Sequence, residues 1–384
     1  MNRKRLCIVM GGHWDAQMGG AQFQAKCLVE QLGSRRDVET YYVANIVPPV
    51  LRQETHEIVP FGSRPSAGAW DVLLSLPSLY RTLKKLRPDV VYQRCLMPYT
   101  GVCALYCAWH RARFVFHVAS DMDVTPLPVR GFGPRALLYR LSRWIGDYGL
   151  RHANVVVAQT RTQAGLLQKQ HGVQAGAVVP NFHPVPRMRD DVRDDRVLRV
   201  IWVANLKPVK RPELFVELAE AFGGRTDVQF IMIGRDGGPQ YRALHQRMRG
   251  LPNLVFLGEL PLERVEAEIA ASHVMVNTSS IEGFPNTFIQ AWLRGLPVVS
   301  SLVDPDGCLS KGGGGRVGGE GADLAAVMRE LLDDREELRR LGEAARAHGL
   351  ANHRPERAQP LVDLLLDDGS APRTKTDAAQ PRLS

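Results

Sequence analysis

Residues 274–301 read VMVNTSSIEGFPNTFIQAWLRGLPVVSS. An apolar run, Val274–Asn277, is followed by a polar turn with glycine and proline, and then by the amphipathic stretch Asn286–Arg294. A second apolar run, Val298–Ser301, closes the segment. Short apolar runs bounded by turn residues predict buried strands, and the stretch between them has the length of a crossover helix. We therefore predict a strand–helix–strand unit with parallel strands.

The same alternation runs through most of the chain. The other expected strands are Leu6–Met10, Tyr41–Ile46, Asp89–Tyr92, Phe114–Val118, Val155–Gln159, Val200–Ala204, Gln229–Ile233 and Leu254–Leu257. The other expected helices are Ala21–Leu32, Ser78–Leu86, Thr162–His171, Pro212–Ala221, Tyr241–Arg249, Leu262–Ala271, Ala322–Leu332 and Glu336–His348. The glycine-rich stretch Gly312–Gly321 follows no predicted strand and lacks the Lys-Ser/Thr ending of a P-loop, so we expect a loop there.

A chain of 384 residues exceeds what one hydrophobic core usually organises. The alternation stops at the polar stretch Pro186–Arg199, which has the composition of a linker, and then restarts. We therefore predict an α/β protein with two Rossmann-like, doubly wound domains, residues 1–185 and 186–350, that face each other across a cleft. Ligands of such sheets bind beyond the carboxyl ends of the strands. The residues from 369 to 384 are polar and are expected to be a disordered tail.

The composition is that of an ordinary globular protein, with 45% hydrophobic and 23% charged residues. No apolar run approaches the roughly 18 residues needed to span a bilayer. The N-terminal apolar run ends at Gly11, too early for a signal peptide, so we expect a cytoplasmic protein.

Positive charge is concentrated in the first half, with a net charge of +11 over residues 1–180 and −2 over residues 181–384. This asymmetry indicates an anionic partner, for which nucleic acid, phospholipid head groups and a phosphorylated acceptor are candidates. The segments Trp109–Arg113 and Arg130–Trp144 interleave arginine with aromatic and aliphatic residues. They fit a surface that rests on an anionic membrane, and they fit equally an ordinary amphipathic helix with a solvated basic face. No recognised nucleic-acid-binding module is present, so we predict no nucleic-acid partner.

The six cysteines show no disulfide framework and no C-x-x-C spacing. Cys103, Cys107 and His110 are spaced to share one helix face, which is compatible with a metal site. Small residues buried in a helix are the favoured interpretation.

Three strand-to-helix connections carry residues suited to an anionic ligand such as a diphosphate. Glu282 precedes the helix that starts at Asn286, where free amides and the helix dipole favour an anion and where a carboxylate can accept hydrogen bonds from sugar hydroxyls. Lys210 follows the strand that ends at Ala204, and Gly19-Gly20 follows the first strand. The alternatives are a polar turn or cap for Glu282, a solvated lysine at a helix start for Lys210, and a simple tight turn for the glycines.

These residues resemble the signature of the family 4 glycosyltransferases, which have the GT-B fold, and the similarity covers nearly the whole chain. The family pattern is Glu, seven residues, Glu, of which the first binds the donor sugar and the second the nucleotide ribose. Glu282 occupies the first position, whereas Gln290 replaces the second glutamate. The family lysine corresponds to Lys210, and Asn205 stands where an arginine is usual. Lys207 and Arg211 are the nearest replacement cations.

The resemblance implies further site residues. It places His117 near the reacting centre and the loops at Gly234 and Gly258 around the nucleotide. The expected donor-binding set is Gly19, Gly20, Asn205, Gly234, Gly258, Gly283, Phe284, Pro285, Asn286, Thr287 and Gln290, with Lys210, Glu282 and His117 as the catalytic set. The segment Asp121–Asp123 imitates an Asp-x-Asp metal motif, but GT-B enzymes generally need no metal, so no metal and no cofactor are expected.

The resemblance also implies an activity. It predicts a retaining transferase that moves a hexose from a UDP- or GDP-sugar to a hydroxyl of a saccharide or lipid-linked acceptor in bacterial cell-surface polysaccharide or lipid-linked glycan synthesis. Residues 186–350 would bind the donor, residues 1–185 the acceptor, and a helix in 351–368 would return to the first domain. The basic first domain would rest on the inner face of the plasma membrane. The alternatives are a GT-B sugar-nucleotide epimerase and a non-catalytic sugar-nucleotide-binding protein.

Overall fold

The computed structural model describes residues 3–62, 69–125, 131, 133–187, 193 and 196–367. It divides into two compact units: Met1–Phe182 with the segment that starts at Pro355, and His183–Arg354. The expected tail at 369–384 and much of the expected linker lie outside the described residues.

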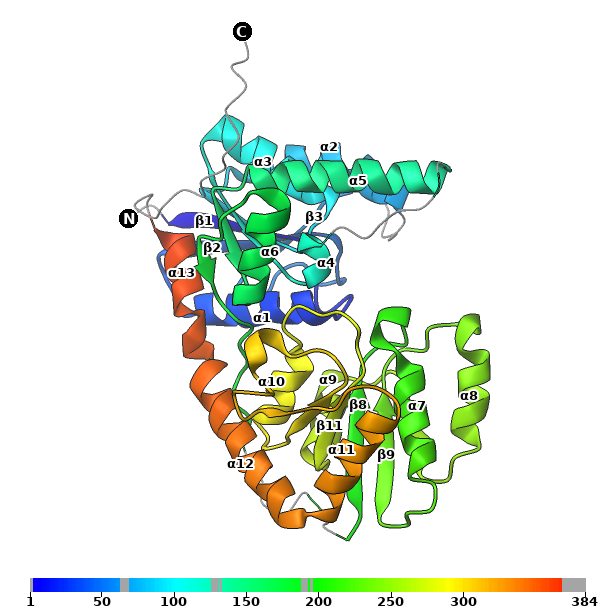
Figure 1. Cartoon of the computed structure of the whole chain (residues 1–384). Coiled ribbons are helices and arrows are strands. Elements are labelled where there is room, and N and C mark those ends of the chain that lie inside the picture. Colours follow the sequence, from blue (N-terminus) through cyan, green and yellow to red (C-terminus); the bar gives the residue numbers. More distant parts are fainter. Residues whose placement is uncertain are drawn as a thin grey trace. The chain divides into compact units, whose positions relative to one another are not determined.

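The first unit contains a seven-stranded parallel sheet in the order β3-β2-β1-β4-β5-β6-β7. Its strands are β1 (Lys4–Gly12), β2 (Val38–Ile46), β3 (Glu57–Pro60), β4 (Val90–Arg94), β5 (Arg113–His117), β6 (Val155–Ala158) and β7 (Ala177–Val178). Its helices are α1 (Gly20–Leu32), α2 (Ala69–Leu86), α3 (Pro98–His110), α4 (Asp121–Val124), α5 (Pro134–Arg151), α6 (Arg161–His171), the 3-10 turn η4 (Pro355–Ala358) and α13 (Gln359–Leu366). In Figure 1, α2, α3 and α5 cover one face of this sheet and α1 covers the other. Because both faces are covered, the strands are apolar on both sides, as in the fully buried run Leu6–Val9.

The C-terminal segment belongs to the first unit through contacts at its end. Lys4 Nζ donates a hydrogen bond of 2.7 Å to the carbonyl of Leu366, and the Arg113 guanidinium donates one of 2.9 Å to the carbonyl of Asp367. The Arg113 guanidinium also pairs with the Asp367 carboxylate at 3.4 Å. These bonds hold the end of α13 beside β1 and β5.

The second unit contains a six-stranded parallel sheet in the order β10-β9-β8-β11-β12-β13. Its strands are β8 (Leu198–Val203), β9 (Val228–Ile233), β10 (Leu254–Phe256), β11 (Val274–Asn277), β12 (Val298–Ser300) and β13 (Gly315–Val317). Its helices are α7 (Pro212–Ala221), α8 (Arg242–Arg249), α9 (Leu262–Ala270), α10 (Asn286–Trp292), α11 (Ala322–Asp333) and α12 (Arg335–Asn352), with 3-10 turns η1 (Pro208–Lys210), η2 (Pro239–Tyr241) and η3 (Pro305–Gly307). Successive residues of β8 enter different cores: Val200 and Trp202 pack with α7, α8 and α11, while Ile201 packs with α9, α10 and α12. This period of two on a sheet covered on both sides explains the continuous apolar run.

Both sheets are doubly wound and reverse their winding direction beside their first strand. In the first unit the reversal falls between β1 and β4, and in the second between β8 and β11. Such a reversal leaves a crevice at the carboxyl ends of the two strands, which is where open α/β sheets bind ligands. The topology therefore predicts that ligands bind at the loops after β1 and β4 in the first unit and after β8 and β11 in the second.

The expectation of a loop over Gly312–Gly321 is wrong in its centre, where β13 pairs with β12. A Cβ atom on Gly315 would lie 1.8 Å from the carbonyl oxygen of Val298, so only glycine allows these two strands to approach. Gly315 is thus required by the packing of β13 against β12. The helix expected at Ser78–Leu86 likewise begins earlier, at Ala69, and continues through the exposed Pro77.

Candidate functional site

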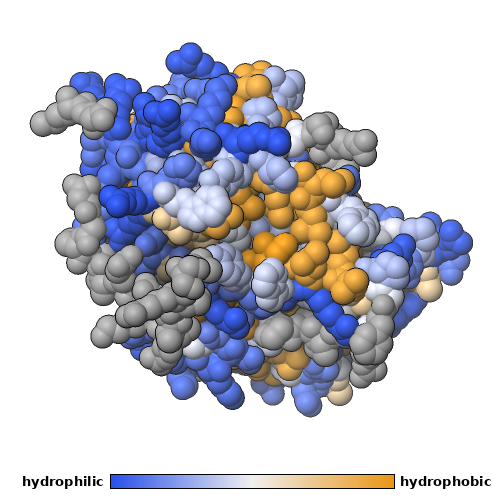
Figure 2. Space-filling model, turned by 90° about the horizontal axis from the view of Figure 1, so that it is seen from above, coloured by the Kyte–Doolittle hydropathy of each residue, from blue (hydrophilic) through white to orange (hydrophobic). Residues whose placement is uncertain are grey.

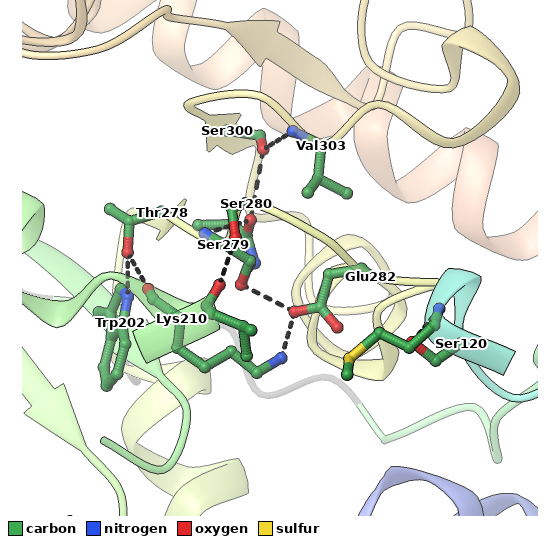
Figure 3. Close-up of polar contacts among 12 residues, drawn as sticks. Ser120, Trp202, Lys210, Thr278, Ser279, Ser280, Glu282, Ser300 and Val303 are labelled. Atoms are coloured by element: carbon green, nitrogen blue, oxygen red, sulfur yellow. Dashed lines mark hydrogen bonds and ion pairs between the residues drawn. The ribbon is translucent and has the colours of Figure 1, made fainter. Parts of the chain in front are cut away.

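Lys210 and Glu282 form an ion pair at the reversal point of the second sheet. The loop after β8 passes through η1 and carries Lys210, and the loop after β11 carries Glu282. The Lys210 ammonium donates to the Glu282 carboxylate, although 72 positions separate the two in sequence. Figure 3 shows the two side chains pointing toward one another from these loops.

Hydrogen bonds between the two loops hold this pair in place (Figure 3). Ser279 Oγ donates to the same Glu282 carboxylate oxygen at 2.8 Å. Thr278 Oγ1 donates to the carbonyl of Lys210 at 2.7 Å, and the buried Trp202 indole donates to Thr278 Oγ1 at 2.9 Å. The amide of Ser280 donates to the carbonyl of Val209 at 2.9 Å. The positions of both charges are therefore set by main-chain and side-chain bonds.

The pair is partly buried, with side-chain exposures of 25% for Lys210 and 16% for Glu282. Each group is thus accessible to a ligand, yet neither is fully hydrated. The ammonium can bind an anionic oxygen and the carboxylate can accept from a hydroxyl, because each has bonding capacity beyond the ion pair. The two groups together can recognise a ligand that carries phosphate next to hydroxyl groups.

Asn205, Gly234 and Gly258 meet at the carboxyl ends of β8, β9 and β10. The Asn205 side-chain carbonyl accepts from the amide of Arg235 at 3.0 Å, and the amide of Gly234 donates to the carbonyl of Gly258 at 2.9 Å. A Cβ atom on Gly234 would lie 1.7 Å from the carbonyl oxygen of Ala204. Asn205 thus shapes the loop through a backbone contact. Arg235 pairs with Glu259 at 2.7 Å.

The segment from Gly283 to Gln290 lies mostly inside the second unit. Gly283, Phe284, Pro285 and Gln290 are buried, whereas Asn286 and Thr287 at the start of α10 are partly exposed. The Phe284 ring packs against His353 with ring centres 4.7 Å apart. The role of Gln290 as a ribose ligand stays a prediction, as do the donor contacts of the loop.

His183 is buried and hydrogen-bonds with Asn286 at the start of α10. Burial, followed by the charges of Arg294 and His353, lowers the pKa of His183 to about 3, while a hydrogen bond with Asn286 acts in the opposite direction. The imidazole is therefore neutral near physiological pH, and a neutral ring is the form that a buried site tolerates.

In the first unit, Gly19 caps the start of α1 and Gly20 opens it, directly after the turn that follows β1. A Cβ atom on Gly19 would meet only the end of the Gln22 side chain, at 2.7 Å. The packing of this unit therefore does not require glycine at position 19, and a role in ligand approach stays a prediction.

His117 ends β5 and is completely buried. The Tyr92 hydroxyl lies 2.9 Å from His117 Nδ1, and the Arg94 guanidinium lies 3.4 Å from the same atom. Since a guanidinium can only donate, Nδ1 is the acceptor and the proton lies on Nε2. Burial and then the Arg94 charge hold the pKa of His117 well below its usual value. The imidazole is neutral, and its contact with an acceptor stays a prediction.

Sequence reasoning missed a buried polar cluster next to His117. Arg94 at the end of β4 donates to the Asn181 side-chain carbonyl, which also accepts from Gln159 at 3.1 Å. Arg94 is only 2% exposed, and no acidic residue in the described ranges forms an ion pair with it. The available signal was positional, because each of these polar residues ends or directly follows an apolar strand or run.

The two candidate metal motifs have structural roles. Cys103 and Cys107 are buried in the core between α2, α3 and the sheet. The Asp123 carboxylate accepts from the amides of Leu96 at 3.0 Å and Ala119 at 2.8 Å. Within the described part of the chain, no group of three His, Cys, Asp or Glu residues could hold a metal ion.

No helix among the described residues is both long and apolar enough to cross a bilayer.

Comparison with known proteins identifies both units. Residues 19–181 match the family model described as "Glycosyl transferase 4-like domain", and residues 198–334 match "Glycosyl transferases group 1". The D-inositol 3-phosphate glycosyltransferase of Nocardia farcinica is 27% identical over 250 residues, which cover 58% of this chain and 55% of that protein. This chain thus spans about half the length of that relative. The GDP-mannose-dependent alpha-mannosyltransferase of Mycolicibacterium smegmatis is 26% identical over 311 residues, or 74% of this chain and 75% of the relative.

A solved structure shares the fold. Anabaena HepE, solved in complex with UDP and glucose, has a TM-score of 0.72 and 18% identity, and the match covers 94% of this chain and 99% of HepE. Both units of this chain have a parallel, doubly wound sheet, and the two family models cover them one after the other. The chain therefore belongs to the family 4 glycosyltransferases of the GT-B fold.

Proposed function

We propose that this protein transfers a hexose from a nucleotide-diphosphate sugar to an acceptor hydroxyl with retention of anomeric configuration. The observation that carries the proposal is the Lys210–Glu282 pair at the β8–β11 reversal point. A cation suited to a diphosphate stands there beside a carboxylate suited to sugar hydroxyls, and the two are juxtaposed as phosphate and sugar are in the donor.

In this proposal the acceptor oxygen attacks the anomeric carbon on the face from which the diphosphate departs. The new glycosidic bond forms as the carbon–oxygen bond to phosphate breaks, the electron pair stays on the phosphate oxygen, and the acceptor proton passes to it. Lys210 and the amides at Asn286 and Thr287 offset the charge that develops on the leaving group. Glu282 orients the sugar, Gln290 the ribose, and His117 the acceptor.

Lys210 would supply the charge that a metal ion supplies in other transferases. We therefore propose a reaction without metal or cofactor, so that turnover survives a chelator. Loss of turnover in EDTA with recovery on adding a divalent cation would contradict this point.

The names of the relatives support a nucleotide-sugar donor without choosing its base. One relative is named for GDP-mannose, and HepE was solved with UDP and glucose. We propose a UDP- or GDP-hexose as the donor and a saccharide or lipid-linked acceptor of bacterial cell-surface glycan synthesis. The proposed location is the cytoplasmic face of the membrane.

A thermal-shift screen over UDP-, GDP- and ADP-sugars tests the proposal first. We expect one donor to raise the melting temperature and Lys210→Met or Glu282→Gln to reduce the shift. The anomeric configuration of the product, read by NMR, then tests retention. A protein that releases an epimerised sugar from donor alone would be an epimerase. One that binds donor but transfers to no acceptor in a cell-envelope extract would be a sugar-nucleotide-binding protein.

A further inference from the structure

Half of the tryptophans of this protein lie on its surface, and all three are on neighbouring helices of the first unit. Trp14, Trp202 and Trp292 are buried, whereas Trp70 on α2, Trp109 on α3 and Trp144 on α5 are 63–68% exposed. The sequence contains six tryptophans in all. A large aromatic side chain is costly to leave in water, so three on one set of helices indicate a surface with a partner.

Helix α5 presents an apolar face outward. Leu137, Leu141, Trp144 and Tyr148 are all exposed, and their spacing of four, three and four residues places them within an arc of about 60° on an α-helix. An ordinary amphipathic helix buries such a face and exposes its charged one. In α5 this apolar stripe is exposed, which favours a surface with a partner over an ordinary amphipathic helix with a solvated basic face.

The opposite side of α5 is the one that packs. A Cβ atom on Gly149 would lie 2.3 Å from the carbonyl carbon of Thr100 in α3, and one on Gly101 would lie 2.6 Å from Ile145. The helices cross this closely only because glycines line the crossing. The packing fixes the rotation of α5 about its axis and leaves Leu141 and Trp144 facing away from the protein.

Helices α2 and α3 add to the same surface. Leu74, one turn after Trp70, is 73% exposed, and Trp109 meets Tyr80 of α2 edge-on with ring centres 6.1 Å apart. The three helices pack against one another. Figure 2 views the side on which α2, α3 and α5 lie in Figure 1 and shows apolar side chains gathered there among hydrophilic ones. We call this surface the apolar face, defined by Trp70, Leu74, Trp109, Leu137, Leu141 and Trp144.

Basic residues accompany the apolar face. Helices α2, α3 and α5 together carry seven Lys and Arg but only two Asp and Glu. Arg140 and Arg151 border the apolar stripe of α5, because they lie about 70° and about 50° from its centre on the helix. A second copy docked face to face would bring these positive charges together, whereas an anionic lipid surface complements them.

We propose that the apolar face inserts into the interfacial layer of an anionic lipid bilayer. The tryptophans lie at the depth of the head groups, where the ring is apolar and the indole N–H reaches water. The leucines reach the acyl chains, and the arginines contact lipid phosphates. The apolar face is thus the surface through which the protein would reach the membrane location proposed above. Only the biological purpose of this binding rests on the proposed function.

Flotation of the full-length protein with lipid vesicles tests the proposal without any sugar or nucleotide. We expect binding to phosphatidylcholine vesicles that contain phosphatidylglycerol, and binding at least about fivefold weaker to phosphatidylcholine alone, since each basic residue near an anionic surface adds a modest attraction. Leu141→Asp is expected to lower the partition coefficient about tenfold or more, because it removes a leucine that would enter the bilayer and puts a charge in its place. Leu302→Asp is the matched control, because Leu302 on the second unit is 49% exposed and Leu141 is 45% exposed.

Two further variants keep the test decisive. Trp144→Ala preserves helix propensity and is expected to weaken binding while the circular dichroism spectrum stays unchanged. Arg140→Glu with Arg151→Glu is expected to abolish the preference for anionic vesicles. The proposal is overturned if the wild type stays unbound on anionic vesicles at low salt, or if Leu141→Asp binds as well as Leu302→Asp. It is also overturned if light scattering shows a dimer that the Leu141→Asp substitution dissociates and that added vesicles do not dissociate. A donor-dependent thermal shift measured on the same samples reports separately on the proposed function.

Discussion

Replacing Lys210 by Met separates the two ligand contacts assigned to the Lys210–Glu282 pair. The substitution keeps the length of the side chain and removes its charge. Glu282 retains its 2.8 Å bond from Ser279. The pair is only partly buried, so its loss should cost about 1–2 kcal/mol of stability, between the values for exposed and buried pairs.

The effect on ligand binding should be larger than the effect on stability. A charge-assisted hydrogen bond to a phosphate oxygen contributes about 1.5–3 kcal/mol, so Lys210→Met should weaken binding of the nucleoside diphosphate roughly 10- to 150-fold. Turnover should fall about 100- to 1,000-fold, since the cation acts on charge that grows during bond cleavage. Glu282→Gln should leave the diphosphate affinity within about threefold of wild type and weaken only the sugar-bearing donor.

Isothermal titration of each variant with the nucleoside diphosphate and with the intact donor measures both effects. Lys311→Met, which removes an exposed lysine of the same unit, is the control. The reasoning is refuted if Lys210→Met binds the diphosphate as Lys311→Met does. It is equally refuted if Glu282→Gln loses diphosphate and donor affinity alike, because the two side chains would then not contact different parts of the donor.

Three other predictions follow from buried groups. Burial lowers the pKa of both His13 and His56 from 6.5 to about 4, with Asp15 opposing the shift, so the unfolded chain binds protons that the folded chain does not between those values. The free energy of unfolding therefore has its full value above pH 6.5 and falls as the pH falls toward 4, by up to about 3 kcal/mol for each ring. His13→Gln should make the free energy of unfolding, measured with denaturant, depend less on pH in this range. Gly234→Ala should destabilise the second unit by about 2 kcal/mol or more in chemical unfolding, because its Cβ would overlap the Ala204 carbonyl, whereas Gly224→Ala, whose Cβ meets no atom within 4 Å, should be near neutral. Arg94→Met should raise the pKa of His117 measured by NMR while burial keeps it below 6.5; an unchanged value would show that the Arg94 charge does not act on the ring.

Helix and strand positions were largely predictable because they depend on local patterns. The strand Val274–Asn277 and the helix Pro212–Ala221 have the predicted bounds, since their apolar periods are strong and their ends are marked by turn residues or proline. The strand β13 was missed because glycine has low strand propensity, and its place in the sheet depends on contact with Val298 rather than on its own sequence.

The sequence by itself determined the α/β class, the two-unit organisation and the two loops that carry Lys210 and Glu282. Alternating apolar strands and helices admit few other architectures, and charged residues after strands stand out against them. Only the tertiary structure decided that these two side chains meet, because the order β9-β8-β11-β12 brings together strands far apart in sequence. Only the structure showed that α5 turns Leu137, Leu141 and Trp144 outward. A helical period shows that a helix has an apolar side, but the glycines at the α3 crossing determine which side faces the protein.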